Sequence, residues 1–133
     1  MDSARKTVLS TLWIFAVLNY VYADVFTLFF NPAAHSATAT VTPIAAFVFA
    51  VLMETSIAMV VVSRVLRRGP NRAANIAAGI FHTAFVAWSL FGQRPPPFYV
   101  FFAAVEIACT SFIVAYAWRW RADESVAPAP KAA

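Results

Sequence analysis

The stretch that decides the fold is the apolar run from Pro43 to Leu66, PIAAFVFAVLMETSIAMVVVSRVL. A bilayer is crossed by about 20 apolar helical residues, so this run is long enough to span one. One carboxylate, Glu54, lies in its middle, and the only other charged residue in the run is Arg64 near its end. Because an unpaired acid is costly in hydrocarbon, Glu54 predicts a partner on another helix.

The rest of the chain repeats this pattern. Of its 133 residues, 62% are hydrophobic and 12% are charged, whereas soluble domains carry about 25% charged residues. We therefore predict an all-α integral membrane four-helix bundle with antiparallel neighbours, as one domain over residues 1–121. The transmembrane helices are expected at about 7–30, 43–66, 73–91 and 97–118. Residues 122–133 are rich in Ala, Pro and charge and predict a disordered cytoplasmic tail.

Basic residues set the expected orientation. All but one of the ten Lys and Arg residues precede the first run, lie at the end of the second run or between the second and third, or follow the fourth. The exception is Arg94, so the positive-inside rule predicts both termini and the middle loop of a multi-pass membrane protein in the cytoplasm. The start also has features of a signal peptide ending near Ala23, but the apolar run continues to Phe30. We therefore expect an uncleaved first helix.

Several classes of function have no signature in the sequence. The net charge of +4 comes from residues at helix ends, where they anchor segments, so no nucleic-acid partner is predicted. Cys109 is the only cysteine, which leaves it without an intramolecular disulfide partner. Because there is no Cys/His cluster, no Glu-x-x-His pair and no glycine-rich phosphate loop, we predict neither a metal nor a cofactor.

Each predicted helix contributes one ionisable residue at a similar depth. At about 1.5 Å per residue, these groups lie roughly 9–17 Å below the outer edge of the bilayer. The predicted ligand or proton site consists of Asp24, Glu54, His82 and Glu106, with Asn19, Tyr20 and Asn75 as supporting polar residues.

The spacing of small residues suggests which face of the second run is inward. Ala46, Ala50, Glu54 and Ala58 recur every four residues, and such spacing allows close helix contact in lipid. Glu54 is therefore expected to face the interior with His82. Three ionised carboxylates in one apolar site would repel strongly, so at least one is expected to be protonated.

Three functions remain open at this point. The first is a non-enzymatic site that binds a small ligand or relays protons. The second is a membrane enzyme or redox-complex subunit acting on a quinone or another lipid-soluble substrate. The third is a structural or assembly protein whose polar layer only specifies helix packing. The expected partners are membrane lipids and a small ligand or protons, and the sequence also leaves a homo-oligomer open.

Several short motifs together carry a resemblance. They are Asn19–Asp24 (NYVYAD), Met53-Glu54, Ser63–Leu66 (SRVL), His82-Thr83 and Glu106–Thr110 (EIACT). The chain resembles a family of small, uncharacterised bacterial four-helix inner-membrane proteins, and its second run is similar to the DoxX-like group. The resemblance implies no established activity. For the DoxX-like group it implies an association with quinone-linked redox systems.

Overall fold

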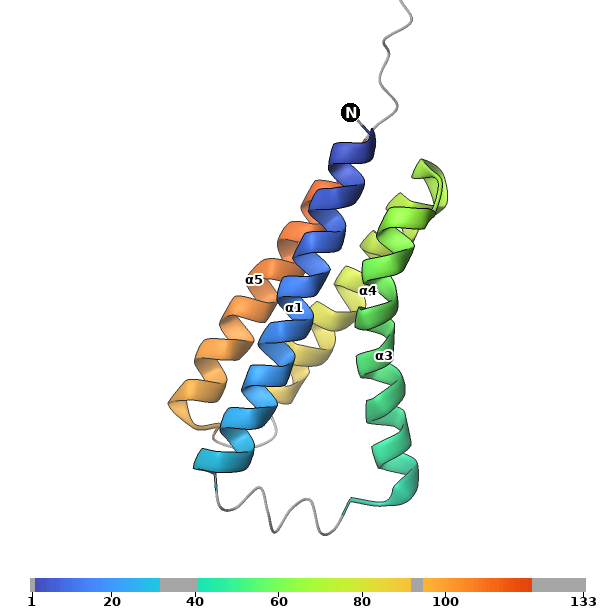
Figure 1. The fold of residues 1–133 in the computed structure, drawn as a ribbon. Helices are drawn as coiled ribbons and strands as arrows, with labels where there is room; N and C mark the ends of the chain where they lie inside the picture. The colour runs from blue at the N-terminus through green and yellow to red at the C-terminus, as the bar shows by residue number, and fades with distance from the viewer. Residues whose placement is uncertain (1, 32–40, 92–94, 121–133) are drawn as a thin grey trace, which may run out of the picture.

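The structure, a computed structural model, describes residues 2–31, 41–91 and 95–120 and folds them into four α-helices (Figure 1). They are α1 (Asp2–Phe30), α3 (Pro43–Val65), α4 (Arg68–Ser89) and α5 (Pro97–Trp118). The predicted all-α class is confirmed, and α1, α3 and α5 are long and apolar enough to cross a membrane. The predicted tail at 122–133 lies outside the described residues.

Proline residues determine where two of the helices begin. Pro43 and Pro97 are the first residues of α3 and α5, where a missing N–H removes no intrahelical hydrogen bond. The start of α3 is also capped, because the Thr42 hydroxyl accepts a hydrogen bond from the Ala45 amide at 3.2 Å. Such a cap stabilises a helix end by about 1 kcal/mol.

The starts of the other two helices differ from the prediction. Helix α4 begins at Arg68 and not at residue 73, and Gly69 and Pro70 belong to its first turn. Proline is tolerated there because first-turn amides have no partner within the helix. The connection between α3 and α4 is therefore only Leu66 and Arg67. Likewise, α1 begins at Asp2 and not at residue 7.

Neighbouring helices run antiparallel, and α3 is packed less evenly than the others (Figure 1). Helix α1 packs along both α3 and α5, and α4 packs along α5, while α3 meets α4 over a smaller contact. The start of α1, the α3–α4 connection and the end of α5 lie together, and we call this the basic end. Towards the opposite end, α3 diverges from α1 (Figure 1).

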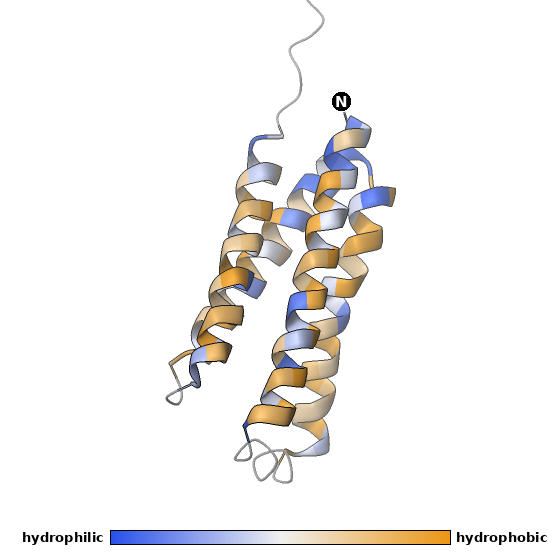
Figure 2. Cartoon of the chain, turned by 60° about the vertical axis from the view of Figure 1, so that its left-hand side comes forward, coloured by the Kyte–Doolittle hydropathy of each residue, from blue (hydrophilic) through white to orange (hydrophobic). Residues whose placement is uncertain are grey.

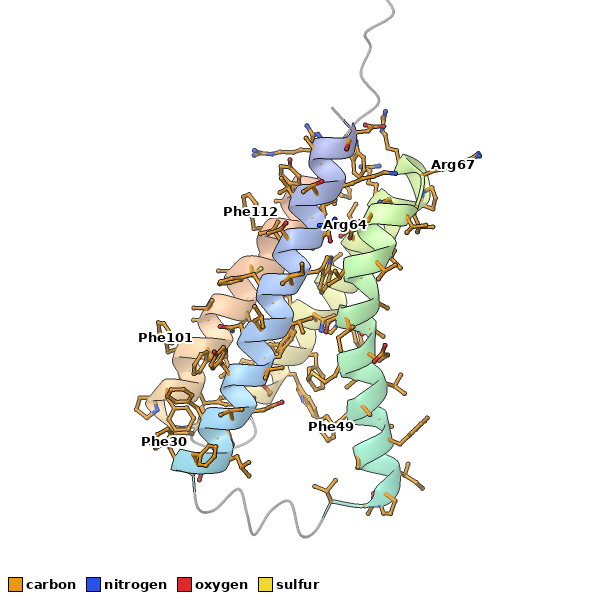
Figure 3. The ribbon with its side chains drawn as sticks, viewed as in Figure 1. Phe30, Phe49, Arg64, Arg67, Phe101 and Phe112 are labelled. Atoms are coloured by element: carbon orange, nitrogen blue, oxygen red, sulfur yellow. The ribbon has the colours of Figure 1, made fainter. Side chains whose placement is uncertain are left out.

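Hydrophobic residues occur along all four helices (Figure 2), and many large apolar side chains are exposed. Phe101 and Phe112 project outward from α5 (Figure 3) and are 64% and 53% exposed. The interior, by contrast, holds eight buried polar residues among those described, which are Ser10, Ser56, Ser63, Asn71, Asn75, His82, Glu106 and Thr110. An apolar exterior around a polar interior is the arrangement expected in lipid, where polar groups need partners inside the protein.

A close contact between two helices involves Gly79 on α4. A Cβ atom at this position would lie 2.6 Å from Val114 Cγ2 and 3.2 Å from the Thr110 carbonyl oxygen on α5. One turn further along, the hydroxyls of Thr83 and Thr110 are hydrogen-bonded at 2.7 Å. A small residue and an interhelical hydrogen bond therefore hold α4 and α5 together, as is common between membrane helices.

Candidate functional site

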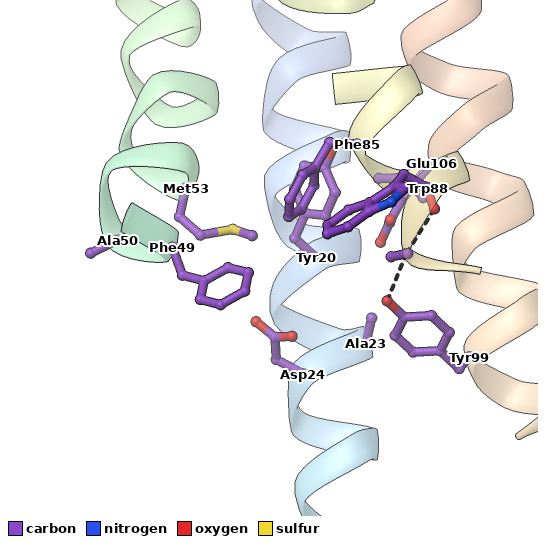
Figure 4. A pocket seen from close by; sticks show the side chains of 12 residues that line it. Tyr20, Ala23, Asp24, Phe49, Ala50, Met53, Phe85, Trp88, Tyr99 and Glu106 are labelled. Atoms are coloured by element: carbon purple, nitrogen blue, oxygen red, sulfur yellow. Dashed lines mark hydrogen bonds between the residues drawn. The ribbon is translucent and has the colours of Figure 1, made fainter. Parts of the chain in front are cut away.

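A pocket of about 460 Å³ lies in the half of the bundle where α3 diverges (Figure 4). All four helices contribute to it, and its walls are mostly aromatic or aliphatic. The lining residues are Tyr20, Ala23, Asp24, Phe49, Ala50, Met53, Phe85, Val86, Trp88, Ser89, Tyr99 and Glu106. Its volume lies within the roughly 300–1,000 Å³ range of small-molecule sites.

Two of the four predicted site residues line this pocket. Glu106 on α5 is only 5% exposed, whereas Asp24 on α1 is exposed. Asp24 lines the same pocket as Phe49 of α3 (Figure 4). The pocket therefore has one carboxylate in its interior and a second at its rim.

Asn19 is hydrogen-bonded to Glu106. Its side-chain amide donates to Glu106 Oε1 at 3.0 Å and to the Phe102 carbonyl oxygen at 3.1 Å. The amide thus links α1 to α5 and fixes one carboxylate oxygen. Among the described residues, the other oxygen, Oε2, has no hydrogen-bond partner, and Glu106 lines the pocket.

His82 lies beside the pocket in a hydrogen-bonded position. Its Nδ1 is 3.2 Å from the Tyr20 hydroxyl, and its Nε2 is 3.0 Å from the Thr55 hydroxyl. The Thr55 hydroxyl donates to the Leu52 carbonyl oxygen at 2.6 Å, so it can only accept from His82. A neutral imidazole with its proton on Nε2, accepting at Nδ1 from Tyr20, satisfies all three groups. Among the described residues, neither Glu54 nor Glu106 is hydrogen-bonded to His82.

Glu54 is placed differently from the prediction. It is exposed, and it does not line the pocket. The inward face of α3 carries Phe49, Met53, Ser56 and Met59. Glu54 is two residues before Ser56, which is about 200° around a helix with 3.6 residues per turn. Ala46, Glu54 and Ala58 are exposed, so the expectation that Glu54 faces the interior is corrected. Ala50, the fourth member of the small-residue face, does line the pocket.

Asn75 is also separate from the pocket. Its Oδ1 accepts from Trp13 Nε1 at 2.8 Å and from the Ser63 hydroxyl at 3.1 Å. Its Nδ2 donates to the Asn71 carbonyl oxygen at 2.9 Å and to Asn71 Oδ1 at 2.7 Å. Asn71 in turn donates to the Ser63 carbonyl oxygen at 2.6 Å. This network, which we call the asparagine network, joins α1, α3 and α4.

The aromatic walls of the pocket were not predicted. Phe49 and Phe85 face each other across the α3–α4 contact, with ring centroids 6.3 Å apart. Trp88 follows Phe85 at 6.3 Å, and Tyr99 donates to the Ser89 hydroxyl at 3.0 Å. Aromatic residues are frequent throughout this sequence, so their presence alone gave no signal. Within the described ranges, no group of three or more His, Cys, Asp or Glu residues forms a metal site.

These observations define the class: an all-α protein of four described helices, three of them long and apolar enough to cross a membrane. The chain belongs to a family of unknown function (DUF6326), whose model matches residues 1–127. A search of curated proteins found no match, and a search of solved structures found none either. The comparisons do not confirm the resemblance to the DoxX-like group.

Proposed function

We propose that the protein is a four-span inner-membrane protein that binds a small amphiphilic molecule carrying a cationic group. In this proposal α4 is the fourth span, since its buried polar residues, such as Asn75 and His82, face other helices and not lipid. The basic end lies in the cytoplasm, because Lys and Arg concentrate there. The pocket then opens in the outer half of the membrane.

The observation that carries this proposal is a buried carboxylate inside an aromatic pocket. Glu106 offers a negative charge, and Tyr20, Phe85 and Trp88 surround the same volume with ring faces and edges. Aromatic rings attract cations, most strongly where water is excluded. A ligand with a cationic head and an apolar body would match both features, and Asp24 at the rim would attract it.

Access from the bilayer is consistent with the packing of α3. The α3–α4 contact is the weakest between neighbouring helices, and Phe49 and Phe85 meet across it beside the pocket. We infer that an amphiphilic ligand reaches Glu106 between these two rings. A lateral route of this kind would also serve a lipid-soluble substrate of an enzyme, but the described lining of the pocket includes neither a cysteine nor a histidine.

Proton relay is less well supported than ligand binding. In the described part of the chain, Asn19 connects Glu106 only to a backbone carbonyl. His82 is held by Tyr20 and Thr55, and each of these bonds is satisfied by a neutral imidazole. A relay needs groups that exchange protons along a connected path, and this arrangement fixes them in place.

The test compares two ions of the same shape and opposite charge. Tetraphenylphosphonium and tetraphenylborate are titrated calorimetrically into purified protein in a neutral detergent. We expect the cation to bind and the anion to bind much more weakly. Glu106→Gln should weaken cation binding by at least about tenfold, because it removes a buried charge partner.

Glu54→Gln provides the matched control. It makes the same chemical change on the exposed face of α3, so cation affinity should not change. Equal binding of both ions would contradict the proposal. So would a Glu54→Gln variant that loses as much affinity as Glu106→Gln, since Glu54 does not line the pocket.

A further inference from the structure

A second cavity lies at the basic end and shares no residue with the first. Its volume is about 460 Å³, and its lining comes from the start of α1, the end of α3 and the start of α4. The lining residues are Asp2, Ser3, Lys6, Arg64, Arg67 and Arg68. Four cationic side chains and one carboxylate therefore surround a single space.

Two other basic side chains at this end, those of Arg5 and Arg72, contact α5. Arg72 donates through Nε to the Ala117 carbonyl oxygen at 3.2 Å and through Nη2 to the Trp118 carbonyl oxygen at 3.3 Å. The Arg5 guanidinium lies over the Tyr116 ring at 5.2 Å. These two arginines are bound to α5, and neither lines the cavity. The four cationic residues that line the cavity are therefore a different set from Arg5 and Arg72, which contact α5.

Arg64 is held in position for a ligand. Its Nε donates to the Ser10 hydroxyl at 2.9 Å, and this hydroxyl donates to the Val60 carbonyl oxygen at 2.9 Å. Ser10 is fully buried, so the bond fixes the base of the guanidinium. Within the described residues, the two terminal nitrogens of Arg64 form no hydrogen bond. A fixed guanidinium with free terminal N–H groups is suited to bidentate binding of phosphate.

The start of α4 adds to this positive field. Its N-cap residue, Arg67, makes no side-chain capping hydrogen bond, and the first-turn amides of a helix have no partner within the helix. The only acid in the lining, Asp2, accepts a hydrogen bond from Trp120 Nε1 at 3.0 Å. This bond directs one of its oxygens towards α5. Anions are stabilised at such a helix start when cationic side chains surround it.

We propose that this cavity binds the phosphate group of an anionic ligand at the membrane surface. An anionic phospholipid headgroup and a soluble phosphate compound share this chemistry. The lining belongs to the end that the proposed topology places in the cytoplasm, where anionic headgroups are within reach. The site does not depend on the aromatic pocket, so either proposal can fail without the other.

The experiment measures lipid binding to purified protein in neutral detergent by native mass spectrometry. The probes are phosphatidylglycerol, which is anionic, and phosphatidylcholine, which is zwitterionic. We expect phosphatidylglycerol to bind more tightly. Arg67→Gln and Arg64→Gln should each weaken it by about fivefold, the effect of one cation near a charged membrane surface. Arg67 is exposed, so its variant should fold normally.

Arg5→Gln is the control, since it removes the same charge from the same end outside the cavity. It should leave phosphatidylglycerol binding nearly unchanged. If inorganic phosphate competes with phosphatidylglycerol in the wild type but not in Arg67→Gln, the site binds soluble phosphates. If inorganic phosphate does not compete in the wild type, the site binds lipid. Equal binding of the two lipids would overturn the proposal. An Arg5→Gln effect as large as that of Arg67→Gln would also do so.

Discussion

In the half of the bundle near the basic end, buried polar side chains bond to one another, whereas in the half near Phe30 they line a pocket. The asparagine network joins three helices through Trp13, Ser63, Asn71 and Asn75. At the other end, Asn19 is the only described side chain that hydrogen-bonds to the Glu106 carboxylate, and α3 diverges (Figure 1). Polar residues of similar types therefore hold the helices together in one half of the bundle and leave space for a pocket in the other half.

The comparison shows that a small number of polar contacts determines where the helices of this bundle pack closely. Apolar side chains gain little from leaving lipid for another helix, so packing and hydrogen bonds determine helix association. Where Ser56 and Ser63 face inward, α3 lies against its neighbours. Where Phe49 and Met53 face inward, the walls of a pocket result. Substitutions in the two halves should therefore have separable effects on stability and on binding.

Asn75→Leu should have the largest effect on stability. The substitution keeps a similar volume but removes the partners of Trp13 Nε1, the Ser63 hydroxyl and Asn71 Oδ1. Leaving such groups unsatisfied should lower the free energy of unfolding by about 2–4 kcal/mol. Tyr99→Phe, which removes one pocket hydrogen bond, should cost about 0.6 kcal/mol. Unfolding of both variants in detergent measures the difference, and equal losses would contradict it.

Gly79→Ala should have the next largest effect. The new methyl group would meet Val114 Cγ2 and the Thr110 carbonyl oxygen, and overpacking of this kind costs about 1–3 kcal/mol. Gly69→Ala is the matched control, because nothing lies within 4 Å of the added Cβ. It should change the free energy of unfolding by less than about 1 kcal/mol, because the gain from a less flexible unfolded chain is opposed by a Cβ directly before Pro70. Equal losses at both glycines would contradict the close contact between α4 and α5.

Phe49→Ala should alter binding more than stability. Phe49 is 48% exposed and lies opposite Phe85 at the edge of the pocket. Its removal should weaken tetraphenylphosphonium binding by about tenfold, through lost ring contact, while the unfolding midpoint changes little. Phe47→Ala is the control, since Phe47 is 70% exposed on the same helix and does not line the pocket. Equal losses of affinity in Phe49→Ala and Phe47→Ala would show that the two rings affect binding only through their contact with detergent.

The sequence predicted the helices better than it predicted their faces. The range of α5 was predicted as observed, and that of α3 to within one residue at its end, because proline and run length define both. Helix α3, however, is apolar on almost every side, so its inward face has no periodic signal. The spacing of small residues therefore predicted that the face with Glu54 is inward, whereas in the structure the face with Ser56 is inward. The pocket also depends on the divergence of α3, which arises from contacts with residues distant in sequence.

Glu54→Leu should have the smallest effect of all. Glu54 is exposed and makes no hydrogen bond within the described residues, so its loss should change the free energy of unfolding by no more than about 0.5 kcal/mol. Glu106→Leu, which removes the partner of Asn19, should cost about 1–2 kcal/mol. A large loss in Glu54→Leu would mean that another group covers the carboxylate. Sedimentation of the variant would then identify this group. Loss of a dimer would show that a second copy of the chain covers Glu54, and an unchanged monomer would show that Glu54 lies inside the bundle.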